Sequence, residues 1–170
     1  MMPGLRGGEH VGITVPSLEE AHRFLVEVLG AKLVFDGGEI ADDHTVTRVL
    51  GANRGDRARY RFYRLGHGLN LEVFEYDTED RGSHPGNHQG GGHHLALYVD
   101  AIAPAVAHLR AHGVGVDDPE HIADGPAAGS DWAYFKAPWG LQMELVSYPN
   151  GKGYERDAEV RLWHPAHPER

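Results

Sequence analysis

His10–Val15 reads HVGITV and His94–Val99 reads HLALYV, and these two short runs decide the fold. In each run, aliphatic residues occupy alternate positions, which is typical of a strand with one buried face. Each run also begins with a histidine. The chain therefore contains two similar strands, and both place an imidazole at their first position.

A helix is expected after each of these strands. Ser17, with Glu20 three residues later, forms a capping box that predicts a helix start. Apolar residues then recur at helical spacing as far as Leu29, and Gly30 ends the pattern. In the second half, the same spacing runs over 102–109 and stops before a glycine at 113.

Further strands complete each half. In the first half they are expected at 31–35, 59–65 and 70–76, with a loop over 36–57 that includes a strand fragment near 45–50. In the second half they are expected at 114–116, 132–136 and 141–147. Both halves thus follow the order βαβββ, so the predicted fold class is α+β, with two tandem modules forming a curved mixed sheet around a shared cleft. The modules cover 8–76 and 93–148, with a Gly-rich linker over 77–92 and a C-terminal tail over 149–170.

The composition excludes several classes of partner and site. The formal charge of −9 disfavours nucleic acid and anionic membranes as partners. No cysteine is present, which excludes disulfides, thiolate nucleophiles and zinc–thiolate sites. The N-terminal segment lacks the apolar stretch of a signal peptide, and no segment is apolar enough to span a bilayer. We therefore expect a cytoplasmic protein that acts on a small molecule.

Five arginines between positions 54 and 64 depart from this acidic balance. Arg59 and Arg61 would share one face of the strand predicted at 59–65. Such a face is usually solvated, and a clamp for phosphate or carboxylate groups is the alternative.

Four of the predicted strands place a potential metal ligand opposite their aliphatic residues. Each half offers a histidine at the start of its first strand and a glutamate inside its last strand, at 10 and 72 and at 94 and 144. A lone histidine or glutamate on a strand is more often solvated than a ligand, but matching positions in both halves favour a shared role. Because facing imidazoles and carboxylates are costly to bury without a cation, we predict one divalent metal ion bound by His10, Glu72, His94 and Glu144 in the cleft.

Four segments resemble the signature segments of the vicinal oxygen chelate superfamily. They are HVGITVPSLEEAHRFLVEVLG from position 10, NLEVFEY from 70, GGHHLALYVDAI from 91 and APWGLQMELVSYP from 137. This superfamily includes glyoxalase I, methylmalonyl-CoA epimerase, extradiol dioxygenases, fosfomycin-modifying transferases and bleomycin-binding proteins. The resemblance identifies His94, rather than His93, as the second histidine ligand. It also implies pairing into a homodimer.

The number of ligands separates the branches of the superfamily. Dioxygenases and fosfomycin-modifying transferases resemble sites with two histidines and one glutamate, whereas Glu72 adds a fourth ligand here, as in the glyoxalase I and methylmalonyl-CoA epimerase branch. The resemblance therefore implies a metal-dependent isomerase or lyase that abstracts an α-proton and stabilises an enolate. It assigns the base to Glu144 first and to Glu72 second. Zinc, manganese, nickel, cobalt and iron are all compatible.

The substrate is expected to be a small hydroxyketone, such as a keto-sugar or keto-cyclitol. Polar residues on the inner faces of the strands suit such a molecule; they are Thr14, Asn70, Tyr98 and Gln142. Three alternatives stay open: a glyoxalase I-type lyase acting on a glutathione hemithioacetal, a ring-cleaving extradiol dioxygenase, and a drug-sequestering binding protein.

Overall fold

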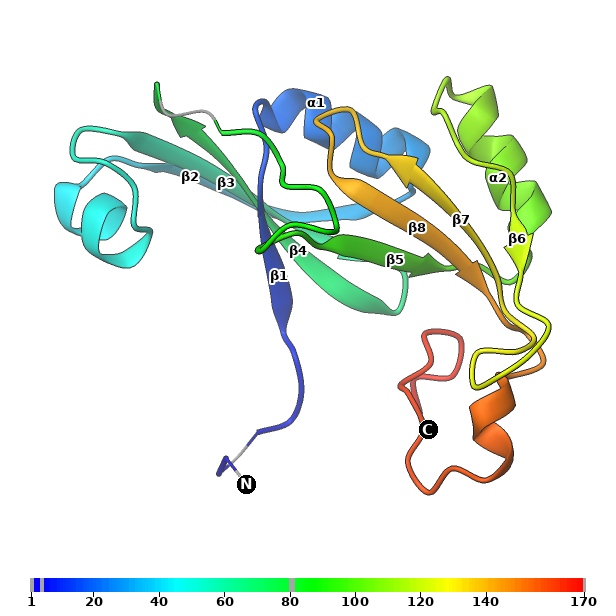
Figure 1. Ribbon diagram of the computed structural model, residues 1–170. Helices are drawn as coiled ribbons and strands as arrows, with labels where there is room; N and C mark the ends of the chain where they lie inside the picture. The colour runs from blue at the N-terminus through cyan, green and yellow to red at the C-terminus, as the bar shows by residue number, and fades with distance from the viewer. Residues whose placement is uncertain (1, 4, 80–81, 170) are drawn as a thin grey trace. The chain divides into compact units, whose positions relative to one another are not determined.

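The computed structural model describes residues 2–3, 5–79 and 82–169, which form two compact units, Met1–Gly82 and Ser83–Arg170. The division falls inside the Gly-rich stretch from 77 to 92. Within the described ranges, no helix combines the length and the apolar character needed to cross a bilayer. Each unit is built on its own four-stranded sheet (Figure 1).

The sheet of the first unit has the strand order β1-β4-β3-β2. Its strands are β1 His10–Thr14, β2 Lys32–Ile40, β3 Arg57–Leu65 and β4 Gly68–Asp77. The first strand runs parallel to β4, and the other neighbours are antiparallel, so the sheet is mixed. The predicted strands at 59–65 and 70–76 are confirmed, and a turn at Gly66 and His67 joins them.

The sheet of the second unit repeats this plan with the order β5-β8-β7-β6. Its strands are β5 His94–Tyr98, β6 Glu120–His121, β7 Asp131–Lys136 and β8 Gln142–Ser147. Again the first strand is parallel to the last, and the remaining pairs are antiparallel. The predicted α+β fold with two βαβββ modules is thus confirmed.

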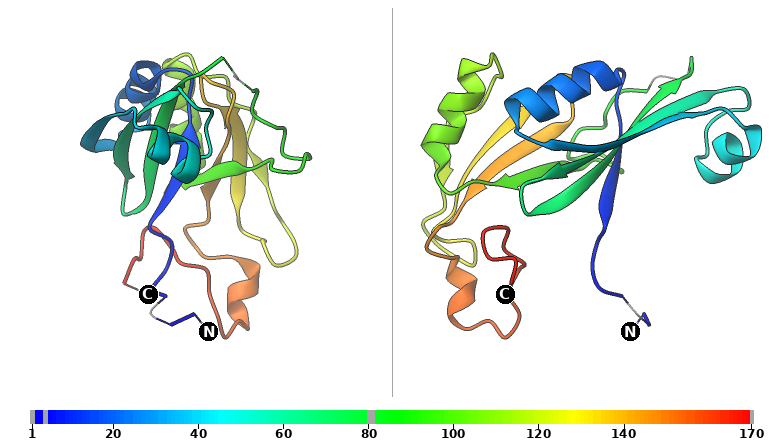
Figure 2. Two further views of the ribbon diagram at one scale, coloured as in Figure 1. Left: turned by 90° about the vertical axis from the view of Figure 1, so that its left-hand side faces the viewer. Right: turned by 180° about the vertical axis from the view of Figure 1, so that it is seen from behind.

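One helix lies between the first two strands of each unit and packs on one face of its sheet (Figures 1 and 2). In the first unit, α1 Leu18–Arg23 begins at Ser17, whose hydroxyl accepts a hydrogen bond from the Glu20 amide at 3.2 Å, as predicted. The helix continues as the π-helical turn η1 Phe24–Val28. In the second unit, α2 Ile102–Ala111 buries Val106 and Leu109.

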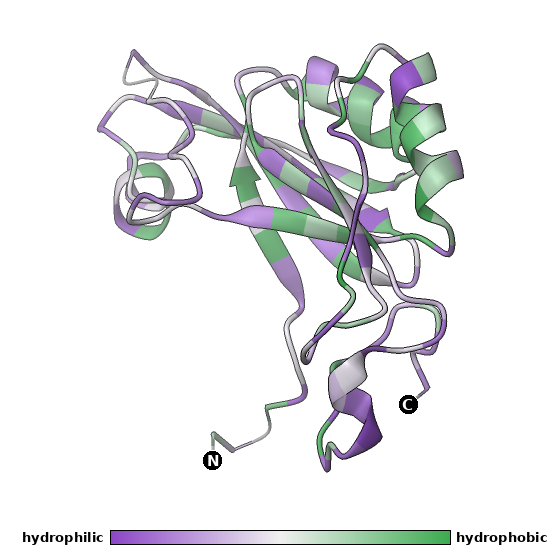
Figure 3. Ribbon diagram, turned by 45° about the vertical axis from the view of Figure 1, so that its right-hand side comes forward, coloured by the Kyte–Doolittle hydropathy of each residue, from purple (hydrophilic) through white to green (hydrophobic). Residues whose placement is uncertain are grey.

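The buried core of each unit lies between helix and sheet, because aliphatic residues alternate along the strands. Figure 3 shows this alternation as changes between hydrophilic and hydrophobic colour along the strands. In the first unit Ile13, Leu71 and Val73 are buried; in the second unit Met143 and Leu145 are buried. Residues of opposite parity on these strands therefore occupy the other face of each sheet, which we call the inner face.

Three local predictions were wrong. The strand predicted at 31–35 continues to Ile40, because β2 pairs with β3 along its whole length. The fragment near 45–50 is the π-helical turn η2 Thr45–Val49, at the far end of the β2–β3 hairpin (Figure 1). Its β-branched residues favour a strand, but among the described residues this segment pairs with no strand. At 114–116 only Val116 makes a single bridge, to Phe135.

Four of the five arginines pair with carboxylates of their own unit, and Arg64 donates to the Gly66 carbonyl at 3.0 Å. Arg59 pairs with Glu75 at 2.8 Å, and Arg61 pairs with Glu19 at 2.6 Å and with Asp36 at 2.8 Å. Arg57 pairs with Glu39, and Arg54 with Asp43. These pairs fit the solvated-face interpretation and leave little support for an anion clamp.

Candidate functional site

The first candidate pair joins His10 and Glu72 across two parallel strands. His10 is opposite Asn70 in the register, and Gly12 is opposite Glu72, so the glutamate lies one diagonal step beyond the histidine on the inner face. The His10 Nε2 and Glu72 Oε2 atoms are 3.2 Å apart. A methyl group at Gly12 would lie 4.0 Å from the same carboxylate oxygen, so the small residue leaves room for the glutamate to reach the imidazole.

Glu9 orients the His10 ring from its other side. Its carboxylate forms a hydrogen bond with His10 Nδ1, and Asn70 Nδ2 donates to the Glu9 carbonyl at 2.9 Å. The hydrogen bond with Glu9 raises the pKa of His10 above its ordinary value of 6.5, and the negative charge of Glu72 adds to that increase. Because Nδ1 faces Glu9, the ring directs Nε2 towards Glu72, which is the orientation a ligating histidine needs.

The second candidate pair repeats this geometry in the second unit. His94 is opposite Gln142, and Glu144 is opposite Ala96, so the two side chains have the same diagonal relation. The His94 Nε2 and Glu144 Oε2 atoms are 3.1 Å apart. The carboxylates are the more buried partners, since Glu72 and Glu144 are 21% and 16% exposed against 37% and 38% for the histidines.

An aromatic ring lies edge-on to the imidazole of each pair. Phe62 is opposite Glu72 in the register, and its ring centroid lies 5.4 Å from that of His10. Tyr134 is opposite Glu144, and its ring lies 5.7 Å from His94. Burial, and then the charge of Glu144, raises the pKa of Tyr134, so its hydroxyl stays protonated at neutral pH. Each half-site therefore consists of a histidine, a glutamate and an aromatic ring.

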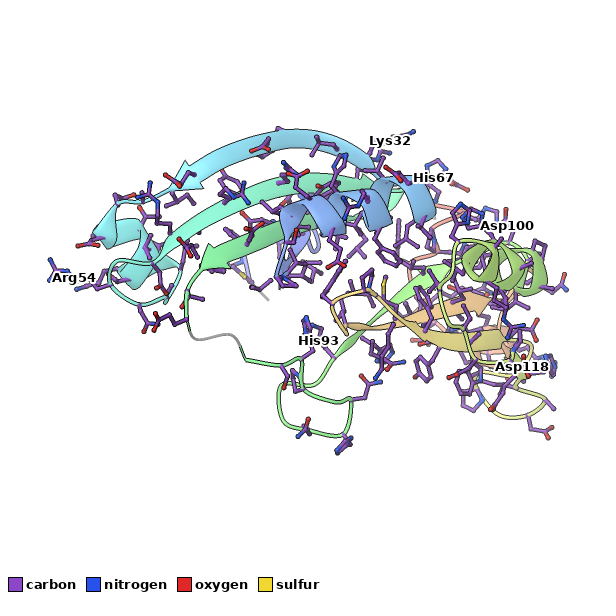
Figure 4. The ribbon with its side chains drawn as sticks, turned by 90° about the horizontal axis from the view of Figure 1, so that it is seen from above. Lys32, Arg54, His67, His93, Asp100 and Asp118 are labelled. Carbon is purple, nitrogen blue, oxygen red and sulfur yellow. The ribbon has the colours of Figure 1, made fainter. Side chains whose placement is uncertain are left out.

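The aromatic surface extends along the inner face of the first sheet. Tyr60 stacks on Phe74 at 5.6 Å, and Phe62 stacks on Phe35 at 4.8 Å. Figure 4 shows Lys32 and His67 at one end of this sheet and Arg54 at the other. The inner face thus offers apolar ring surfaces beside a polar pair.

The chemistry of the donor atoms suits a divalent cation. Imidazole nitrogen and carboxylate oxygen are ligands that zinc, manganese, iron, nickel and cobalt all accept. In each pair these atoms are close together on a partly buried face, where a cation would offset the cost of burying the carboxylate. Across the described residues, no group of three or more His, Asp or Glu side chains is placed to hold a metal ion. The structure therefore brings the four predicted ligands together as two pairs.

Three other histidines, His93, His108 and His112, lie away from these pairs. His93 forms a hydrogen bond from Nδ1 to the Gly91 carbonyl at 3.1 Å, whereas His94 contacts Glu144. His108 on α2 and His112 at its C-terminal cap are exposed neighbours with ring centroids 4.3 Å apart, and His112 Nδ1 lies 2.8 Å from the His108 carbonyl. Neither of these two histidines lies on the inner face of a sheet.

Glu9, Phe62 and Tyr134 are the residues of the half-sites that the sequence analysis missed. An exposed glutamate just before a strand has no pattern that distinguishes it. The two aromatic rings could have been found, because Tyr134 alternates with the buried Ala133 and Phe135, which places it on the inner face.

Comparisons with known proteins found a matching family model and a curated relative. A family model described as the Glyoxalase/Bleomycin resistance protein/Dioxygenase superfamily matches residues 9–135. A curated protein from an Actinomyces species, named 2-epi-5-epi-valiolone epimerase, is 44% identical over 167 residues, which cover 96% of this chain and 91% of that protein.

Solved structures share the fold at lower sequence identity. A glyoxalase family protein from Bacillus cereus has a TM-score of 0.68 and 18% identity, and covers 86% of this chain and 98% of its own. The fosfomycin resistance protein FosX from Listeria monocytogenes, in complex with Mn(II) and sulfate, has a TM-score of 0.55 and 18% identity, and covers 92% of this chain and 98% of its own. At these identities the likeness concerns the fold alone.

Proposed function

The chain belongs to the glyoxalase/bleomycin resistance protein/dioxygenase superfamily, and on that premise we propose that it is a metal-dependent epimerase of a keto-cyclitol. The predicted superfamily is thereby confirmed, and the relative at 44% identity supports an enzyme of the epimerase class. The main support for the proposed metal site is the pair of equivalent His–Glu contacts, at 3.2 Å and 3.1 Å, with the same strand register in both units.

The four residues His10, Glu72, His94 and Glu144 are proposed to hold one divalent metal ion together. The likeness to FosX, which was solved with Mn(II), supports a divalent cation without fixing its identity among zinc, manganese, nickel, cobalt and iron. When bound, the cation would attract the vicinal oxygens of a hydroxyketone and stabilise negative charge on the ketone oxygen. Glu9 and Asn70 would keep the His10 ring in the required orientation.

The chain's own carboxylates supply the proton transfer. Glu144 is proposed to take the α-proton of the ketone on one of its carboxylate oxygens, which leaves the substrate as an enolate. Return of a proton to the opposite face of the same carbon inverts its configuration, and Glu72 is proposed for that role. Atoms and electrons balance without an oxidant, since one proton leaves and one returns.

The substrate class rests on the relative and on the inner face. The relative is named for the epimerisation of 2-epi-5-epi-valiolone, and the predicted keto-cyclitol is of that chemical class. Apolar ring faces such as Phe62 and Tyr60 suit the C–H faces of a cyclitol ring. Polar neighbours such as Asn70 and Gln142 suit its hydroxyls.

Proton exchange tests the proposal directly. With metal-replete protein in deuterated buffer, 2-epi-5-epi-valiolone should lose its α-proton NMR signal and give the epimer. Glu144→Gln should lower kcat/KM by roughly 100-fold or more, because the amide cannot accept the proton. Glu120→Gln, on the exposed strand β6 of the same unit, is the matched control and should match the wild type. No exchange on any keto-cyclitol by protein with bound metal would refute the proposal.

Metal analysis tests the ligand set independently. Protein purified without chelators should carry one equivalent of a divalent metal, and His94→Ala should lose most of it. His93→Ala changes the adjacent imidazole, which faces Gly91, and should keep the metal. Oxygen consumption with a catechol and tolerance of Glu72→Ala would favour a dioxygenase instead.

A homodimer and a cytoplasmic location complete the proposal. The homodimer rests on family resemblance, and light scattering at several protein concentrations tests it. The cytoplasmic location rests on the absence of cysteine, which suits a reducing compartment. Cell fractionation tests it.

A further inference from the structure

The described part of the C-terminal tail, residues 149–169, is anchored to the second unit although it lies outside the βαβββ repeat. Its 3-10 helix η3 Gly153–Arg156 follows β8. The Gly153 amide donates to the Ala128 carbonyl and the Tyr154 amide to the Pro126 carbonyl, both at 2.9 Å. Later in the tail, the Leu162 amide donates to the Tyr154 hydroxyl at 2.8 Å. Held by these bonds, the tail turns back and lies near the ends of β5 and β8 (Figures 1 and 2).

The anchored tail places His164 against two tyrosine rings. The His164 centroid lies 4.4 Å from that of Tyr98 and 4.8 Å from that of Tyr148, and the two tyrosine rings are 5.1 Å apart. All three contacts are edge-to-face, which is a favourable arrangement for aromatic rings. The three rings therefore form one cluster, which we call the tail cluster.

The tail cluster lies on the same inner face as the His94–Glu144 pair. Tyr98 is opposite Val146 in the register, so Tyr148 is one diagonal step beyond Tyr98. That is the relation which Glu144 has to His94. The cluster repeats the geometry of the metal pair four residues further along both strands, which corresponds to about 13 Å.

The groups in and around the tail cluster are suited to hydroxylated ligands. Burial raises the pKa of Tyr98 and of Tyr148, so both phenols stay neutral hydrogen-bond donors. Ser130 would be the next residue opposite Tyr148 if the antiparallel register continued. It is 2% exposed, and no group in the described part of the chain forms a hydrogen bond with its hydroxyl. A buried hydroxyl without a partner costs free energy unless a ligand or water completes it.

We propose that Tyr98, Tyr148 and His164 form a distal subsite that recognises the hydroxyl groups of the substrate ring, so that the tail determines substrate specificity. This inference rests on the proposed epimerase function. The interval of about 13 Å between the cluster and the metal pair, less the side chains at both ends, suits one hydroxylated six-membered ring. Because the cluster is this far from Glu144, His164 acts as a specificity residue and takes no part in the proton transfer.

Two variants test the subsite in different ways. His164→Ala removes the imidazole itself. Gly153→Ala removes none of the three rings but displaces the tail that carries His164, because the added methyl group would lie 2.5 Å from the Gly125 carbonyl oxygen. Gly115→Ala is the matched glycine control, since nothing lies within 4 Å of its added methyl group and its φ is not in the left-handed region. His121→Ala, at an exposed position on β6, is the histidine control.

The readout is discrimination between a large and a small ketone. For each protein, kcat/KM is measured for epimerisation of 2-epi-5-epi-valiolone and for α-proton exchange of dihydroxyacetone, which has no ring hydroxyls. His164→Ala and Gly153→Ala should each lower the ratio of these values at least tenfold, with most of the loss in KM for the cyclitol. Both controls should keep the wild-type ratio. An unchanged ratio in both test variants would overturn the subsite.

Binding keeps the subsite testable if no turnover is found. Addition of 2-epi-5-epi-valiolone to the wild type should shift the imidazole NMR signals of His164, and His164→Ala should weaken binding at least tenfold in calorimetry. Binding with this pattern but without proton exchange would refute the epimerase and leave the subsite standing. Exchange of dihydroxyacetone without any shift of His164 on addition of the cyclitol would refute the subsite and leave the epimerase standing.

Discussion

Gly37 is a position where one added methyl group should have a large effect, because the ring of Tyr60 lies directly over it. A methyl group at Gly37 would lie 2.0–2.5 Å from three atoms of that ring, far inside the ordinary carbon–carbon contact of about 3.5–4.0 Å. The register of β2 and β3 shifts between Asp36 and Gly38, so Gly37 is the extra residue of a bulge. Gly37→Ala must therefore displace Tyr60.

The cost follows from what Tyr60 contacts. Its ring stacks on Phe74 at 5.6 Å and lies edge-on to Phe62 at 6.2 Å. Aromatic pairs contribute about 0.5–1.5 kcal/mol each, and overpacking costs typically about 1–3 kcal/mol. Because the ring can swing aside, Gly37→Ala should destabilise the protein by about 1–2 kcal/mol. Each kcal/mol corresponds to a fall in Tm of about 2–4 °C in a chain of this size.

A double-mutant cycle isolates the clash. Urea unfolding is measured for the wild type, Gly37→Ala, Tyr60→Ala and the double variant, with Gly115→Ala as the open-space control. Without the Tyr60 ring, Gly37→Ala should be neutral, or stabilising by a few tenths of a kcal/mol through the unfolded chain. Equal destabilisation by Gly37→Ala in both backgrounds would show that the ring is not the cause.

Three further predictions concern the first unit. Arg61→Met should lower the free energy of unfolding by about 1–2 kcal/mol at low salt, since Arg61 is 15% exposed and pairs with Glu19 and Asp36. An equal loss of unfolding free energy at 1 M salt would contradict an ionic origin of the effect. Arg61 lowers the pKa of the Glu19 and Asp36 carboxylates below their ordinary values of 4.5 and 3.8. The two ion pairs therefore add their full contribution to the folding stability above these ordinary pKa values. That contribution is lost as the pH falls through the lowered pKa values of the folded protein. The stability difference between wild type and Arg61→Met, measured by urea unfolding, should therefore shrink from pH 7 to pH 3, and a constant difference would argue against these pairs. Gly12→Ala should keep kcat/KM within about twofold of the wild type, because its methyl group would lie 4.0 Å from Glu72 Oε2, an ordinary contact. Gly12→Leu should lower kcat/KM at least tenfold, because the larger side chain displaces that carboxylate. Equal kinetics of the two variants would show that the space beside Glu72 is not needed.

Strand periodicity predicts the candidate pairs well, because each ligand alternates with buried aliphatic residues. Glu144 lies between Met143 and Leu145, which are 1% and 3% exposed, so its place on the inner face follows from the period of two. The diagonal contact between glutamate and histidine depends on the parallel register of the strands. That register is set by packing between elements far apart in the chain, which local patterns do not encode.

The failed predictions have physical causes of the same kind. Thr45–Val49 contains β-branched residues that favour a strand, yet it forms a π-helical turn at a hairpin end. The extension of β2 through Gly37 and Gly38 has no apolar alternation, and pairing with β3 supports it. The placement of His164 depends on tail bonds to the loop at 126–128, and no periodic pattern marks such bonds.

The strand order β1-β4-β3-β2 puts the first two strands of the chain at the two edges of the sheet and the next two in its centre. The loop 51–56 separates a fragment that holds both outer strands and His10 from one that holds the central hairpin and Glu72. Neither fragment contains the complete sheet of the first unit, and each lacks one member of the His10–Glu72 pair. A chain split in this loop would therefore regain the proposed four-ligand metal site only through complementation, so that reassembly of the two pieces could be followed as the return of enzyme activity.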